Sequence, residues 1–346
     1  MATTYKALTT NDMVSTRTLL HEAVPVTGTI SSGTYASDGN IKNYSHGMFQ
    51  TVYDYPYLSS SANHIFDITV GYASDSHCSG AASAQNAKKI NIYNQMAQVL
   101  VGFDETGTVR NFDRDGDLSG GTKLKECLFL NFARLLSKDE IKKASFTMSF
   151  ATGGTEAAPE FGNLQTISDY GATTSYKVNS PAGEYGILYT ASAAANADSG
   201  VGLIYYQAGI AILSSSLFDS QFGGPAKAYS TSSILDVMSG SNITASCDGL
   251  RNRINNIAFD NTTELNSTIY FCRAHHSDFN YSSNPTYLDS SKIRVKGNKG
   301  SNSPKAYVTT VGLYSDKNEL LAVAKLSEPL KKDPSIELTL RARIDY

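Results

Sequence analysis

The chain has 346 residues, of which 41% are hydrophobic and only 18% are charged, so it is long enough for two or three domains. The net charge is −3, which implies no basic face and speaks against nucleic acid as a partner. Because no run approaches 18 apolar residues, we expect no membrane span. The surface is predicted to be rich in Tyr, Ser, Thr, Asn and Gly, which is typical of β-rich proteins that contact other proteins, and equally of an ordinary β-rich domain.

The four cysteines are widely separated, and none has the spacing of a metal site. Cys127 and Cys272 lie in apolar runs and are interpreted as core thiols, whereas Cys78 and Cys247 lie in segments rich in Ser and Gly. A reducing compartment explains all four without disulfide bonds. The first twenty residues lack the apolar stretch of a secretory signal.

Residues 1–50 alternate short apolar pieces with turn residues and show no helical period. We expect an extended N-terminal arm with small hairpins. Such an arm is either ordered by neighbouring subunits or packed as a first β-layer on its own domain.

Residues 51–150 are predicted to form an α+β region with two helices. Apolar residues recur at helical spacing in Ala87–Val101, and a second helix is predicted over Lys123–Leu136. His64–Val70 and Lys143–Phe150 have the composition of strands.

Residues 161–248 are predicted to be β-rich and to follow a linker rich in Gly, Ala and Pro at Ala151–Glu160. The expected elements are three strands and one short helix: Thr173–Val178, Gly183–Ala193, Val201–Leu213 and Ser230–Met238.

Residues 249–346 are predicted to form a C-terminal antiparallel β-sandwich. Apolar residues alternate strictly with polar ones from Ile336 to Ile344, which indicates a last strand paired inside a sheet. Ser277–Pro304 is expected to be an exposed or subunit-contacting loop. The fold class that we predict is α+β, mostly β.

The most suggestive chemical motif is the run Asp113, Asp115 and Asp117, because carboxylates at i, i+2 and i+4 can converge on Ca²⁺. The EF-hand pattern fails, however, since Leu118 replaces the glycine of position six and Leu124 replaces the glutamate of position twelve. We therefore favour a solvated acidic turn before a helix, and predict no metal site.

No other pattern indicates catalysis. His275 and His276 follow a predicted strand; within a strand they would point to opposite faces, whereas a loop would let them converge. Nothing in the sequence relates Asp54 to Glu184. A G-x-S-x-G motif and a phosphate-binding glycine loop are both absent. We predict no catalytic residues, no cofactor and no enzymatic activity.

Two C-terminal segments, Tyr307–Asp316 and Glu319–Lys325, resemble a hairpin of tail-fibre and baseplate-associated proteins of tailed bacteriophages. The wider chain resembles structural proteins of T4-like marine and cyanobacterial myoviruses. The segments that carry this wider resemblance are Asn43–Phe49, Asp54–Leu58, Gly202–Gly209 and Phe279–Pro285.

The resemblance implies a structural virion protein, made in the bacterial cytoplasm and placed in the contractile tail baseplate or neck. Its implied partners are other phage structural proteins and copies of itself in a symmetric assembly. The alternatives are a host-binding or fibre-attachment module and a head decoration protein.

Overall fold

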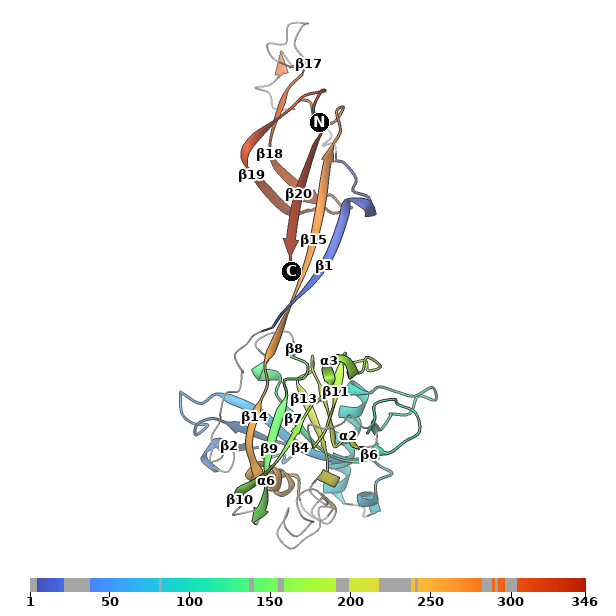
Figure 1. Cartoon of the computed structure of the whole chain (residues 1–346), viewed down its shortest axis with the longest axis vertical. Helices are drawn as coiled ribbons and strands as arrows, with labels where there is room; N and C mark the ends of the chain where they lie inside the picture. The colour runs from blue at the N-terminus through green and yellow to red at the C-terminus, as the bar shows by residue number, and fades with distance from the viewer. Residues whose placement is uncertain are drawn as a thin grey trace. The chain divides into compact units, whose positions relative to one another are not determined.

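The structure is a computed structural model that describes residues 5–21, 38–80, 83–136, 140–154, 159–190, 199–217, 238–239, 242–281, 288–289, 292–295 and 304–346. It is mostly β, with several antiparallel sheets and few helices, which confirms the predicted fold class (Figure 1). The chain divides into two compact units. Unit 1 comprises Met1–Leu19 and Glu264–Tyr346, and unit 2 comprises Leu20–Thr263. This division differs from the four consecutive segments expected, because the N-terminal strand belongs with the C-terminal ones.

The centre of unit 2 is a seven-stranded antiparallel sheet. In sheet order its strands are β11 (Tyr185–Leu188), β12 (Gly202–Tyr205), β13 (Ile210–Ser214), β7 (Glu126–Asn131), β4 (His64–Tyr72), β3 (Gln50–Tyr53) and β2 (Ile41–Asn43). Each central strand is buried along nearly its whole length, so the sheet is covered on both faces.

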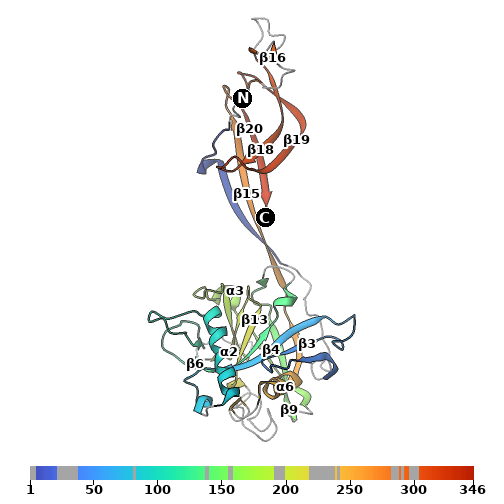
Figure 2. The same ribbon diagram turned by 180° about the vertical axis from the view of Figure 1, so that it is seen from behind.

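Helix α2 (Ala84–Leu100) packs on one face of this sheet, against β4 (Figure 2). It begins at Ser83, whose hydroxyl accepts a hydrogen bond from the N–H of Asn86. Gly71 of β4 permits the contact, since a Cβ there would lie 2.7 Å from the carbonyl oxygen of Lys89. The absence of a side chain at residue 71 therefore sets how closely the helix approaches the sheet.

A second, three-stranded sheet covers the other face, with the order β10 (Pro159–Ser168), β9 (Thr147–Gly154) and β14 (Ile254–Ala258). Four phenylalanine rings pack in the layer between the two sheets, with neighbouring ring centroids 5.6–6.3 Å apart: Phe66, Phe132, Phe146 and Phe259. Helix α6 (Ile243–Arg253) contacts both β4 and β9.

The remaining elements of unit 2 are short. They are the strands β5 (Phe112–Asp113), β6 (Lys123–Leu124) and β8 (Glu140–Ile141), helix α3 (Ala172–Ser175) and three single 3₁₀ turns, η2 (Asp38–Asn40), η3 (His77–Gly80) and η4 (Ala133–Leu135). No helix in the described ranges is long and apolar enough to cross a membrane.

The second predicted helix, Lys123–Leu136, is wrong. The segment forms β6, β7 and the η4 turn. Strand β7 lies between β4 and β13, and its four central residues are buried on both faces. A strand buried on both sides carries a continuous apolar run, which periodicity alone does not distinguish from a helix.

Three further predictions require correction. Thr173–Val178 is not a strand, since Ala172–Ser175 is helix α3. Val201–Leu213 is a hairpin, β12–β13, that reverses at Gly209 with a φ of 65°. Ala151–Glu160 is not a linker, because Gly154 of β9 pairs with Pro159 of β10. The predicted helix Ser230–Met238 lies outside the described residues except for Met238.

Other predictions are confirmed. The strand at His64–Val70 is β4, and the helix at Ala87–Val101 is α2 with one further turn at its start. The predicted strand over Lys143–Phe150 begins later, at Thr147.

Unit 1 contains two main antiparallel sheets. One has the order β1 (Met13–His21), β15 (Asn261–Ala274) and β20 (Leu338–Asp345), and the other pairs β18 (Ala306–Tyr314) with β19 (Leu320–Lys332). A short pair, β16 (Leu288–Asp289) and β17 (Lys292–Val295), and the 3₁₀ turn η1 (Thr10–Asp12) complete the unit.

The last strand is paired, as predicted. Strand β20 pairs with β15 from Ala274 opposite Leu338 to Ser267 opposite Asp345. The first residues of β15, Asn261 and Thr262, belong to unit 2 and pair with β8.

Candidate functional site

The two units differ in how they bury apolar side chains. The hydrophobic core of the described residues lies wholly in unit 2. Among the described residues of unit 1, the buried apolar residues are Ala306 and Ala342 alone. The described part of unit 1 therefore has strands with apolar patterning but no cluster of buried apolar side chains.

The pairing of β18 with β19 shows where the apolar side chains of unit 1 lie. Val311 is opposite Ala324, and Leu313 is opposite Ala322, so these four share one face. Val323 lies on the other face and is 51% exposed. None of the five is buried. The hairpin is thus apolar on both faces and buried on neither.

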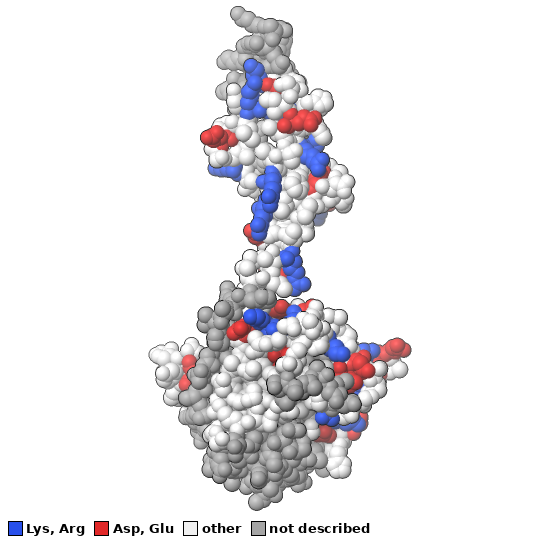
Figure 3. Space-filling view, viewed as in Figure 1, with Lys and Arg blue, Asp and Glu red and all other residues white. Residues whose placement is uncertain are grey.

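Charge is absent from β18 and from the first five residues of β19. Ala306–Tyr314 and Leu320–Ala324 contain no charged residue, whereas charged residues cluster at the turn and in the second half of β19: Asp316, Lys317, Glu319, Lys325, Glu328, Lys331 and Lys332. On the face of unit 1 in Figure 3, charged side chains stand singly among uncharged ones. We define the hairpin surface as the side chains of Tyr307–Tyr314 and Leu320–Ala324, none of which is buried. Tyr307 and Leu321 are its most exposed members, at 61% and 68%.

The hairpin also leaves backbone edges open. Within the described part of the chain, β18 pairs only with β19, and β19 only with β18. A strand with a free edge and no charged residue, such as β18, is a template for pairing with another chain. The geometry supports association by strand addition, by packing of the apolar faces, or by both.

The acidic run predicted from the sequence does converge. One carboxylate oxygen from each of Asp113, Asp115 and Asp117 lies within 4.8 Å of the others. The expected surroundings are wrong in two respects. The loop joins β5 to β6 and precedes no helix, and Asp113 is only 1% exposed. It is buried because it is the last residue of β5, directly opposite Lys123 of β6.

The carboxylates of this loop differ in their electrostatics. Burial raises the pKa of Asp113, although hydrogen bonds from Lys123 and from the N–H of Leu118 oppose the shift. The pKa of Asp117 is lowered, chiefly by a hydrogen bond from the N–H of Ser119. Lys123 Nζ lies 3.0 Å from Asp113 Oδ2, so one charge of the cluster is already balanced.

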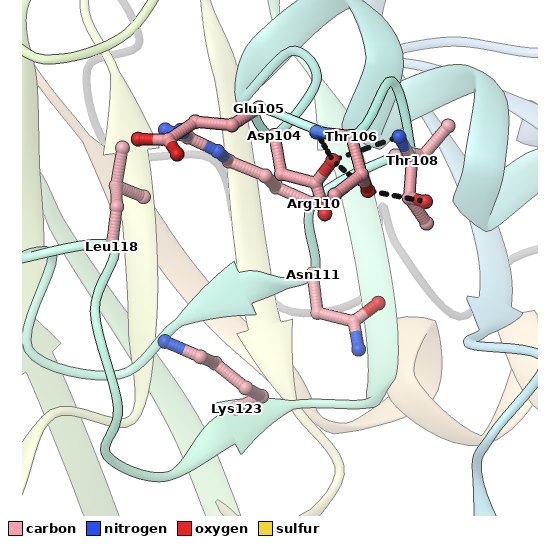
Figure 4. A pocket seen from close by; sticks show the side chains of 9 residues that line it. Asp104, Glu105, Thr106, Thr108, Arg110, Asn111, Leu118 and Lys123 are labelled. Atoms are coloured by element: carbon pink, nitrogen blue, oxygen red, sulfur yellow. Dashed lines mark hydrogen bonds between the residues drawn. The ribbon is translucent and has the colours of Figure 1, made fainter.

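An open pocket lies beside this loop, and its lining includes Leu118 and Lys123 (Figure 4). Asp104 is an acidic residue of the pocket lining. Its Oδ1 accepts hydrogen bonds from the N–H and hydroxyl of Thr106 and from the N–H of Thr108. These bonds lower the pKa of Asp104, with the hydroxyl of Thr106 as the largest cause. The carboxylate of Asp104 therefore stabilises the turn in which it lies.

The other residues considered from the sequence are not brought together. Asp54 accepts hydrogen bonds from Asn63, and Glu184 forms an ion pair with Lys143. The rings of His275 and His276 are exposed, and both face Glu337, at 3.8 and 3.4 Å. Among the described residues, the aspartate loop is the one group of three potential metal ligands that converges.

The four cysteines are free thiols. Cys127 is buried, as predicted, but Cys272 is only half-buried. Cys247 does not lie in a loop, since it is a buried residue of α6.

One buried acid has no signal in the sequence. Asp169 is 1% exposed and accepts hydrogen bonds from the N–H groups of Ala144 and Phe146 and from the hydroxyl of Tyr206. Burial raises its pKa to about 7. Tyr206 is itself fully buried, so this contact also gives its hydroxyl a hydrogen-bond partner inside the core. The groups that donate hydrogen bonds to this carboxylate belong to the interior of unit 2, so we assign Asp169 a role in stabilising the fold.

Comparison with protein-family models, with curated proteins and with solved structures found no match for this chain.

Proposed function

We propose that this chain is a structural component of a tailed-phage virion, in the contractile tail baseplate or neck, and that it acts by protein–protein assembly. The observation that carries the proposal is the hairpin surface, which is apolar on both faces and buried on neither. The virion is proposed as its location, after synthesis in the bacterial cytoplasm.

The physical argument starts from stability. A two-stranded sheet is marginally stable in water by itself, and a third strand or a packed apolar face is needed to hold it. Within the described residues, no third strand pairs with β18 or β19. The ring of Tyr5 packs on Tyr314, with centroids 4.9 Å apart, but Leu321 and Val323 stay exposed. We infer that a partner covers these exposed apolar side chains in the assembled protein.

A further copy of the same chain is the occupant that we assign to this surface. In every copy of the chain, the hairpin surface needs a partner that covers it. Every copy also presents the same apolar faces and open strand edges. Two copies can therefore cover each other's hairpin surface without a second protein. Symmetric assemblies use one surface many times in this way. Other structural proteins then contact the polar surfaces of the assembled units.

The sequence resemblance supports the same conclusion from a different direction. The two segments that resemble a phage hairpin, Tyr307–Asp316 and Glu319–Lys325, fall on β18, the turn and β19. The resemblance is thus concentrated on the surface that lacks a partner.

Particle composition tests the proposed location. Mass spectrometry and immunogold labelling of purified virions should find the protein at one site of the tail, in a fixed ratio to a known tail protein. Absence of the protein from purified particles, with the protein abundant in the infected cell, would overturn the proposal.

A host-binding module is the second candidate. It is favoured by a loop of unit 2 that exposes Tyr55 and Leu58, at 59% and 86%, beside Tyr57. Exposed tyrosines provide rigid, amphipathic contact area for recognition. Cell binding by the purified protein that is lost in a Tyr55→Ala, Tyr57→Ala double variant would favour this role over assembly.

A further inference from the structure

The loop between β5 and β6 contains a buried oxygen atom without a partner. Asp113 Oδ2 accepts a hydrogen bond from the N–H of Leu118, at 2.7 Å, and forms an ion pair with Lys123 Nζ, at 3.0 Å. Its other oxygen, Oδ1, is buried and accepts none. An unsatisfied buried carboxylate oxygen is unfavourable, and a cation beside it removes the penalty.

Three oxygens meet beside Gly121, at a point that its missing side chain leaves open. A Cβ at Gly121 would lie 3.6 Å from Asp115 Oδ2 and 3.8 Å from each of Asp113 Oδ1 and the carbonyl oxygen of Ser119. The unpartnered oxygen of Asp113 therefore faces a small cradle beside Gly121 whose three nearest atoms are all oxygens.

The ligand order matches that of a calcium loop. Asp113, Asp115, Asp117 and the carbonyl of Ser119 are spaced as positions 1, 3, 5 and 7 of an EF-hand. Leu118, where glycine is expected, nevertheless adopts the left-handed conformation that the turn needs, with a φ of 64°. At position six, the loop thus differs from an EF-hand in residue type but has the same backbone conformation.

We propose that the Asp113–Gly121 loop binds Ca²⁺ through Asp113 Oδ1, the carboxylates of Asp115 and Asp117, and the carbonyl oxygen of Ser119. The carboxylate oxygens lie within 4.8 Å of one another, which fits ligands placed about 2.4 Å from a shared ion. The donor set is all oxygen, and three carboxylates with a carbonyl in a protein cage suit Ca²⁺ better than Mg²⁺, which retains its waters.

The neighbouring lysine is compatible with this ion. Lys123 bonds Oδ2 of Asp113, whereas the proposed ion lies on Oδ1. The three carboxylates and Lys123 leave two negative charges, which Ca²⁺ neutralises. Because Leu124 stands where a bidentate glutamate would add two ligands, we expect a dissociation constant on the order of 10⁻⁴–10⁻³ M.

Two glycine variants provide a matched test. Gly120 and Gly121 both have positive φ, of 47° and 63°, so an added Cβ strains the backbone similarly at each. At Gly121 the methyl group enters the cradle, and at Gly120 it meets nothing within 4 Å. Gly121→Ala should abolish the response to Ca²⁺, and Gly120→Ala should keep it.

The measurement is the melting temperature of the full chain, first stripped with a chelator, at increasing CaCl₂ or MgCl₂. We expect a saturable rise of roughly 5 °C at several millimolar Ca²⁺ for the native protein and for Gly120→Ala. Gly121→Ala and Asp115→Asn should show no rise, and calorimetric titration should agree. No response in the native protein, an undiminished response in Asp115→Asn, or an equal response to Mg²⁺ would each overturn the assignment. None of these outcomes depends on self-association through unit 1.

Discussion

The ammonium group of Lys332 donates a 2.7 Å hydrogen bond to Asn280 Oδ1 in the interior of unit 1. The Lys332 side chain is fully buried, and it also bonds the carbonyl oxygens of His276 and Asp333. The interior of unit 1 is therefore organised by a charged side chain, in contrast to the apolar core of unit 2.

The burial of Lys332 predicts a large loss of stability in unit 1 when the ammonium group is removed. Lys332→Met keeps most of the side-chain volume but leaves Asn280 Oδ1 without its donor. The carbonyl oxygens of His276 and Asp333 each lose one of two donors. We expect unit 1 to lose about 2–4 kcal/mol of unfolding free energy, measured by hydrogen exchange of peptides from β19 and β20.

Lys331→Met is the matched control for that variant. Lys331 is exposed, and its ion pair with Asp333 is of the surface type, at 2.9 Å. We expect a loss below about 1 kcal/mol. Equal hydrogen-exchange rates in the two variants would show that the buried hydrogen bonds of Lys332 stabilise unit 1 no more than the exposed ion pair of Lys331 does.

The acid–base behaviour of unit 2 should depend on Asp169. Its pKa is raised from 3.8 to about 7, so between these values the folded state holds more protons than the unfolded state. Raising the pH across this window therefore favours unfolding, by an amount on the order of 4 kcal/mol in the limit. Asp169→Asn should remove this part of the pH dependence, as measured by urea unfolding between pH 4 and pH 8.

Tyr206→Phe gives a second test that does not depend on the asparagine variant folding. The Tyr206 hydroxyl lowers the pKa of Asp169, so its removal should shift the loss of stability to higher pH. A pH profile identical in all three proteins would contradict this account of the buried carboxylate.

The packing of α2 on β4 predicts a sharp difference between two glycines. In Gly71→Ala, the new Cβ would lie 2.7 Å from the backbone oxygen of Lys89 and 2.9 Å from the backbone nitrogen of Tyr93. Since neither backbone atom can move without shifting the helix, we expect a loss of about 3 kcal/mol or more. Gly80→Ala meets nothing within 4 Å, and should stay within about 1 kcal/mol of the native protein in thermal unfolding.

Residue patterns predicted some of this fold well and some of it wrongly, for physical reasons. The alternation from Ile336 to Ile344 identified β20, because a strand with one covered face separates its apolar and polar residues. The pattern of Lys123–Leu136 predicts a helix wrongly, because both faces of β7 are buried and the alternation of a half-buried strand is absent.

The sequence alone does not predict which distant strands pair with each other. Nothing in the residues of β1 indicates that β15, some 250 positions later, is its neighbour in the sheet. The buried position of Asp113 and the cradle at Gly121 likewise depend on how β5 and β6 pair, so the sequence showed three carboxylates but not the environment that gives them a ligand.

The central claim, assembly of copies through the hairpin surface, is tested most directly by sedimentation velocity of the full chain at micromolar concentration. We predict a defined oligomer for the native protein and dissociation of that oligomer in a Leu321→Lys, Val323→Lys double variant, because each new charge enters an apolar contact. Val99→Lys is the control, since Val99 is a 65% exposed apolar residue of α2, outside the hairpin surface, and its change should leave the oligomer intact. A native protein that sediments as a monomer, with unit 1 folded and protected from exchange, would contradict the claim.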